Sequence, residues 1–406
     1  MPNDAAHPAK TRGAVLPLVT STLGLGQAVL FMMLPVLVEH TGIDLLRLSV
    51  AMAVGTGLFL VGAPFWGRRS DRIGRRRAMA QVAGGQLAAN AALAAAVTAT
   101  AAGLLSVQLG FLAVLASRVA YGLTASGILP VAQAWVADAS DRGDRLRQFG
   151  RLSAGTNVGR VVGPVLASLF VALGAMGPLW LLVLSSAIAV AALAFLKGTD
   201  RAPETPPTVE EAPPFRRLLP FVVCAHLMHT AFGLMQYTAG VLIQRRLGLS
   251  AEEASAALGV MLTLAAVAMI AVQLLLLPRL RRRVRTALAA GAAGLAVTGF
   301  GFAAADGMAA FTACVVLFGV SSALMVPANG TLCSMAVAPD QQGVAAGRLT
   351  AANTLGYSTG AVLAGLAGTV ALDLPFLVAG ALAALLLLGS RLLPVPRNPE
   401  NPPKSM

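Results

Sequence analysis

Two arginines lie within long apolar stretches of this chain, where a positive charge requires a specific reason. Arg118 falls inside the stretch 103–130, and Arg160 falls inside the stretch 149–173. If hydrocarbon surrounds these stretches, a cation there is costly unless a partner or water compensates it. The acidic residues fall near the ends of the apolar stretches, so no carboxylate is predicted at the same depth. The arginines therefore predict a cavity that binds anionic, zwitterionic or neutral polar groups and disfavours cations.

A polar face accompanies Arg160. Ser153, Asn157 and Arg160 have the i, i+4, i+7 spacing that places side chains on one side of a helix. Nearer the N-terminus, Gln27 is the one polar side chain in the apolar run 24–35. We interpret these residues as lining one cavity. The alternative is that the arginines have a structural role.

Two histidines stand three residues apart in the apolar stretch 218–243. His226 and His229 share a predicted helix face with Gly233 and Gln236. Because histidine titrates near neutral pH, the deeper His229 is a candidate for a proton-coupling group. The alternative is an ordinary hydrogen bond between helices. Asp138, at the end of another apolar stretch, is the second candidate.

The sequence shows no pattern that predicts a catalytic or metal site. The histidine pair lacks metal-ligand spacing, and no Ser/His/Asp set or phosphate-binding glycine loop is evident. The cysteines, Cys224, Cys314 and Cys333, lie in apolar stretches without paired spacing, so we expect neither a disulfide nor a metal cluster. We therefore expect no metal, no cofactor and no enzymatic activity.

The composition requires membrane-spanning helices to position these residues. Of the 406 residues, 57% are hydrophobic and 12% are charged, and the mean hydropathy is +0.76. A span needs about 20 mostly apolar residues. The predicted spans are 13–37, 44–66, 77–98, 103–130, 149–173, 178–196, 218–243, 254–277, 286–305, 308–334, 345–371 and 374–393. We expect an all-α integral membrane protein with twelve transmembrane helices.

The positive charge is concentrated in alternate loops. The net charge is +13, yet only Arg47, Arg245 and Arg246 fall in the other set of loops. By the positive-inside rule, this asymmetry predicts a cytoplasmic (inner) membrane protein with both termini in the cytoplasm. A nucleic-acid partner would instead require a basic domain with base-reading side chains. We expect no nucleic-acid partner.

The two halves of the chain are related by an internal repeat. One constant offset of 197 residues aligns Gly150 with Gly347, Gly159 with Gly356 and Gly163 with Gly360. Between the halves, the segment 201–217 is rich in proline and acid and reads as a linker. The predicted organisation is a six-helix bundle at 1–200, a cytoplasmic linker at 201–217 and a second six-helix bundle at 218–406.

A charged segment between the second and third predicted spans has a distinctive spacing. Gly67 is followed by Asp71 four residues later, then by Gly74-Arg75 and a further cation, Arg77. This pattern resembles the motif between the second and third helices of the major facilitator superfamily. The resemblance implies two pseudo-symmetric six-helix bundles that work by alternating access. It also implies that these five residues form a conformational latch on the cytoplasmic face.

The other arginines of this segment have a simpler interpretation. Arg68, Arg69 and Arg76 are expected to fix the topology and contact lipid headgroups. The position of a second copy, 278–285, keeps the cations but has lost the aspartate and the glycines. The complete motif is thus confined to the first half.

The fifth predicted span carries a second motif. Gly150, Gly159, Gly163 and Pro164 have the spacing found in the twelve-helix drug and proton antiporter branch of the superfamily, although Ala167 and Ser168 replace its last two glycines. Small residues four apart allow helix backbones to approach closely. The alternative is that the glycines serve helix packing alone.

The resemblance implies a secondary active transporter. We expect a monomer in membrane lipid that exports a small organic compound, such as a drug, metabolite or siderophore, by proton-coupled antiport. Import or symport of a small organic anion is the alternative, and an intramembrane enzyme or lipid scramblase is a more distant one. The residues expected to contact substrate or couple its movement are Gln27, Arg118, Tyr121, Asn157, Arg160, His226, His229 and Gln236.

Overall fold

The computed structural model describes residues 6–139, 145–171, 173–196, 213–280, 283–338 and 341–393. All regular secondary structure within these residues is helical, as predicted. The α-helices are α1 (Ala6–Thr41), α2 (Leu45–Gly57), α3 (Phe59–Ile73), α4 (Arg75–Ala101), α5 (Val107–Ala125), α6 (Ile128–Ala139), α7 (Arg145–Val171), α8 (Gly177–Ala194), α9 (Phe215–Leu247), α10 (Ala251–Ala271), α11 (Val284–Ala304), α12 (Met308–Met335), α13 (Gln342–Val370) and α14 (Leu374–Gly389).

These helices account for the twelve predicted spans. The second span consists of α2 and α3, the fourth consists of α5 and α6, and α10 continues through a π-helical segment (Val272–Leu276) and a 3-10 turn (Leu277–Leu280). Ten stretches are long and apolar enough to cross a membrane. The other two are α14, which is apolar but has only 16 residues, and α13, which has 29 residues and a more polar composition. A helical membrane fold satisfies every backbone group within the chain itself.

The charged segment from Gly67 to Arg77 is helical rather than a loop. Helix α3 continues to Ile73, and α4 begins at Arg75, so Gly74 alone joins them. Its φ of 88° lies in the region that side chains with a Cβ rarely adopt. Both helices thus extend beyond the predicted spans 44–66 and 77–98, because one glycine reverses the chain here and the flanking arginines lie at helix ends.

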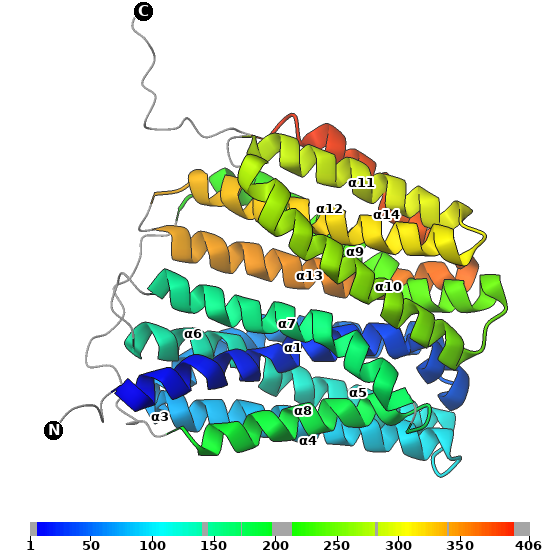
Figure 1. Ribbon diagram of the computed structural model, residues 1–406, viewed down its shortest axis with the longest axis horizontal. Coiled ribbons are helices and arrows are strands. Elements are labelled where there is room, and N and C mark those ends of the chain that lie inside the picture. Colours follow the sequence, from blue (N-terminus) through cyan, green and yellow to red (C-terminus); the bar gives the residue numbers. More distant parts are fainter. Residues whose placement is uncertain are drawn as a thin grey trace, which may run out of the picture.

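The helices form two groups, which we call the first half (α1–α8) and the second half (α9–α14). Figure 1 shows them running side by side, with the second half in its upper part. In the first half α7 packs on α1, and in the second half α13 packs on α9. Of the predicted linker, residues 201–212 lie outside the described residues, and 215–217 belong to α9.

Glycines bring α7 into backbone contact with α1. A Cβ at Gly159 would overlap the carbonyl oxygen of Ser21, and a Cβ at Gly163 would lie 3.2 Å from the Cα of Leu25. The equivalent Gly356 on α13 would likewise overlap the backbone of α9. Gly150 differs, because a Cβ there would meet no atom within 4 Å. Close packing therefore explains Gly159 and Gly163 but not Gly150.

Hydrogen bonds join the two halves toward one end of the bundle. We call the end where α3 meets α4 the basic face, and the end where α1 meets α2 the opposite face. Near the opposite face, the Ser255 hydroxyl on α10 donates to the Met32 carbonyl on α1 over 2.6 Å. At that face itself, His40 Nε2 lies 2.6 Å from the Glu252 carboxylate. The halves are thus tied together on the side away from the basic face.

Replacement of Gly159 by alanine should separate α1 from α7. The new Cβ collides with backbone rather than with a flexible side chain, so we expect a loss of about 1–3 kcal/mol or more. A matched change, Gly150→Ala on the same helix, meets open space and should stabilise the helix by about 0.5–1 kcal/mol. Thermal unfolding in detergent measures both. Equal midpoints for the two variants would contradict the close α1–α7 packing.

Candidate functional site

Arg118 is a buried cation without a carboxylate partner. It is 2% exposed, and its guanidinium carbon lies 4.5 Å from the centre of the Tyr121 ring one turn along α5. Nη2 donates a long hydrogen bond of 3.5 Å to Asn90 Oδ1 on α4. Among the described residues Nε has no partner, and none of the ion pairs involves this arginine. A π-face and one amide oxygen are weak compensation for a full buried charge.

Arg160 faces the second half across the middle of the protein. Its side chain is exposed and passes along Gly24 of α1. It is close enough to interact electrostatically with His229 on α9 and Tyr357 on α13. Because both partners belong to the second half, Arg160 points between the halves rather than toward lipid. The structure therefore brings Arg160 and His229 to one site, as their sequence positions alone could not show.

The imidazole of His229 is held by its own helix. Nδ1 lies 2.9 Å from the Ala225 carbonyl oxygen, and because a carbonyl only accepts, Nδ1 carries the proton. The ring packs edge-on against Tyr357 with centroids 5.0 Å apart. The Gln236 side chain lies close enough to the Tyr357 hydroxyl to interact with it. His226 is partly buried one turn before His229. This Nδ1 hydrogen bond lies within α9, whereas the alternative interpretation of His229 expected a bond between helices.

Tyr237 is a member of this site that sequence reasoning missed. From α9 it packs edge-on against Phe31 of α1, with centroids 4.9 Å apart, and its hydroxyl interacts with Thr56 of α2. Arg118 lies within electrostatic range of it. The chain has only three tyrosines, and all of them, Tyr121, Tyr237 and Tyr357, gather around the two arginines. The small number of tyrosines in the sequence was the feature that could have pointed to Tyr237.

The remaining predicted residues lie on the helices that surround this site. Asn157 on α7 and Gln27 on α1 are both partly buried. Asn157 lies about one turn from Arg160, as the predicted polar face requires. The candidate site thus draws on α1, α2, α5 and α7 of the first half and on α9 and α13 of the second.

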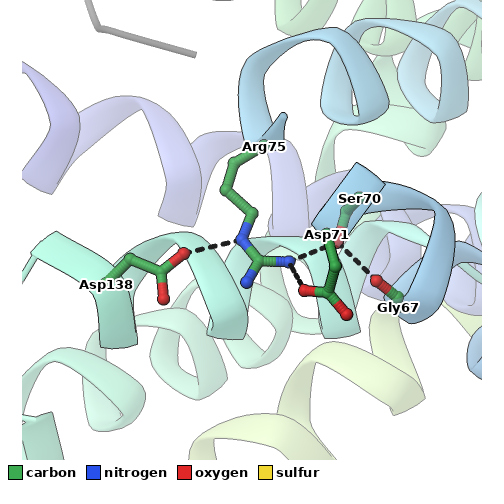
Figure 2. Close-up of polar contacts among 5 residues, drawn as sticks. All are labelled: Gly67, Ser70, Asp71, Arg75 and Asp138. Atoms are coloured by element: carbon green, nitrogen blue, oxygen red, sulfur yellow. Dashed lines mark hydrogen bonds and ion pairs between the residues drawn. The ribbon is translucent and has the colours of Figure 1, made fainter. Parts of the chain in front are cut away.

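The basic face holds a separate network centred on Arg75 (Figure 2). The Arg75 side chain is 10% exposed; its Nε donates to Asp138 Oδ2 over 2.7 Å, and its Nη1 donates to Asp71 Oδ1 over 2.5 Å. Nη1 also donates to the Ser70 hydroxyl, which in turn donates to the Gly67 carbonyl oxygen. One guanidinium therefore ties α3, α4 and α6 together. All three helices belong to the first half.

The other members of the predicted latch have distinct positions. Gly74 is buried and makes the turn between α3 and α4, whereas Arg77 is exposed in the first turn of α4. Arg69, which we expected to fix the topology and contact lipid headgroups, is exposed and donates to Gln81 over 3.1 Å. Asp138, the second candidate for proton coupling, is bound to Arg75.

A cluster at the opposite face was not foreseen from the sequence. The possible ligand atoms of Glu39, His40 and Glu252 lie within 4.8 Å of one another. His40 already contacts Glu252, and the Gln244 amide donates to Glu39. Since each pair joins α1 to a helix of the second half, we assign the cluster to the contact between the halves.

Comparison with solved structures identifies the fold. The human organic anion transporter MFSD10 (TETRAN) is 20% identical, with a TM-score of 0.65 over 94% of this chain and 99% of that one. A nucleoside transporter, NupG (D323A mutant), is 13% identical, with a TM-score of 0.74 over 94% of this chain and 99% of that one. A D-xylose-proton symporter is 13% identical, with a TM-score of 0.76 over 96% of this chain and 99% of that one.

The sequence itself matches a family description over most of its length. Residues 16–347 match the Major Facilitator Superfamily. This match covers the latch segment, the two arginines and the first four helices of the second half, α9 to α12. The chain therefore belongs to the major facilitator superfamily of membrane transporters.

Proposed function

We propose that this protein exports a small organic anion, zwitterion or neutral polar compound across the cytoplasmic membrane in exchange for protons. The observation that supports this class of substrate is the buried guanidinium of Arg118, which lacks an anionic partner among the described residues. Arg160 adds a second positive charge between the halves. A bound anion would compensate both charges, whereas a cation would be repelled.

Alternating access is supported by where the halves touch. The contacts of His40 with Glu252 and of Ser255 with Met32 close the opposite face. The Arg75 network at the basic face stays within the first half. Opening of the opposite face would break a small number of polar contacts and leave each glycine-packed half intact. We assign the basic face to the cytoplasm, with both termini on that side, because its loops hold most of the cations.

Two features, the glycines of α7 and the imidazole of His229, support export and proton coupling. The glycine spacing of α7 resembles that of drug and proton antiporters, and Gly159 and Gly163 make the close contacts that this spacing allows. His229 is the proposed coupling group, because its Nε2 retains a lone pair at the site beside Tyr357. The similarity to a proton symporter keeps uptake of an organic anion as the second candidate.

Replacement of either site arginine by glutamine should reduce anion transport. Each substitution removes a charge-assisted hydrogen bond to the anion worth about 1.5–3 kcal/mol. The rate of anion transport should therefore fall about tenfold or more in Arg118→Gln and in Arg160→Gln. The measurement is transport of a labelled small carboxylate panel in proteoliposomes with an imposed pH gradient. Arg151→Gln is the matched control, since Arg151 is exposed on α7 and donates to Gln148.

The direction of proton movement separates the two candidate functions. Antiport predicts that an inward proton gradient drives the carboxylate outward, and symport predicts the reverse. Transport of a lipophilic cation that neither arginine substitution affects would refute the proposed substrate class.

The latch proposal predicts a conformational effect of Asp71→Asn. The resemblance implies that this segment holds the state closed at the basic face, so weakening one of the two carboxylate contacts of Arg75 should make that state less populated. A single cysteine at Ser153, in a background without Cys224, Cys314 and Cys333, should then be alkylated several-fold faster. Arg69→Gln alters a neighbouring exposed arginine outside the Asp71 pair and should leave the rate unchanged. If both variants raise the alkylation rate equally, the charge of this segment matters but Asp71 has no latch role, and an unchanged rate in Asp71→Asn also contradicts the latch.

A further inference from the structure

The hydrogen bonds around Asn90 fix which end of its amide faces Arg118. The Ser186 hydroxyl on α8 donates to the Leu182 carbonyl oxygen over 2.8 Å, so its oxygen is left to accept a hydrogen bond. Asn90 Nδ2 donates to that oxygen over 3.0 Å. The amide oxygen is therefore turned toward Arg118 Nη2, 3.5 Å away. A chain of three hydrogen bonds thus presents a neutral acceptor to the buried cation.

The position of Asn90 is the place where a carboxylate would neutralise Arg118. Asn90 is 4% exposed and Arg118 is 2% exposed, so an ion pair between them would be only weakly screened by water. Aspartate has the shape of asparagine and would place a negative oxygen at the same point. The sequence instead provides an amide, which leaves the charge of Arg118 uncompensated.

We propose that Asn90 is the residue that sets the charge selectivity of this transporter. Its amide holds the guanidinium in place without neutralising it, so the charge stays available for a carboxylate or similar anionic group of the cargo. The inference rests on the proposed function, because it assumes that the cargo approaches Arg118. Asn90 acts through Arg118 and is a positioning residue rather than a direct ligand.

The first experiment needs no substrate. Asn90→Asp should raise the thermal midpoint of the purified, ligand-free protein, because the new carboxylate pairs with Arg118. In an Arg118→Gln background the same change should lower the midpoint, because the acid is then buried without a partner. Gln86→Glu is the matched control: Gln86 lies one turn before Asn90, is 1% exposed and bonds to Thr22. It should lower the midpoint in both backgrounds. An Asn90→Asp effect that is the same with and without Arg118 overturns the inference.

The second experiment measures charge selectivity with three probes of similar shape. Benzoate, benzamide and benzylamine are anionic, neutral and cationic at pH 7.5, and binding of any of them stabilises the folded protein. The wild type should respond to benzoate most strongly. Asn90→Asp should weaken the benzoate response about tenfold or more. Asn90→Leu removes the acceptor without adding charge and should keep the preference for benzoate.

The outcomes separate this inference from the proposed function. A wild type that responds equally to all three probes or not to benzoate, or an Asn90→Asp variant that keeps the full benzoate response, overturns the role of Asn90. A different result is that the effect of Asn90→Asp on the thermal midpoint depends on Arg118 and the wild type prefers benzoate, but the proteoliposomes show no proton-driven export. The proposed proton coupling then fails, and the role of Asn90 in charge selectivity stands.

Discussion

The close backbone contact of α7 with α1, and of α13 with α9, is the constraint on which the rest of the structure depends. Glycines replace side chains at these crossings, so neither helix pair can slide without a steric clash. Each half is thereby a stiff body built around one such pair. We propose that a change of shape occurs between the halves, where the contacts of His40 with Glu252 and of Ser255 with Met32 lie near the opposite face.

The two stiff halves contribute different chemistry to the site between them. The first half supplies the cations, Arg118 and Arg160, and the second supplies His229 and Tyr357. An anion bound between them would contact both halves at once, and its charge would offset the repulsion that Arg160 imposes on a protonated His229. Under the proposed function, substrate and proton would thus act on one electrostatic site. At the offset of 197 residues, Arg118 aligns with Val315 and Arg160 with Tyr357, so the repeat loses both cations while its packing glycines are kept.

The fold was predictable from the sequence to a greater extent than the site. The apolar runs predicted twelve spans, because the apolar length of a span is a local property, and the repeat at an offset of 197 residues predicted two related halves. The turn at Gly74 was missed, since one glycine with positive φ can replace a loop. Asn90, Tyr237 and the pair of His40 with Glu252 were missed because each acts through a partner from a distant helix. Arg118 and Arg160 were found because a charge in an apolar run is itself a signal.

The distance between the halves tests this account most directly. Spin labels at Arg72 and Ala346 report on the basic face, and labels at Leu104 and Met308 report on the opposite face. In a cysteine-free background, pulsed dipolar spectroscopy should show that a transported anion and a pH gradient shift the two distances in opposite directions. A pair within one half, such as Arg72 and Leu104, should stay constant. Distances that change within a half, or that change in the same direction at both faces, would contradict the rocking of two glycine-packed bodies.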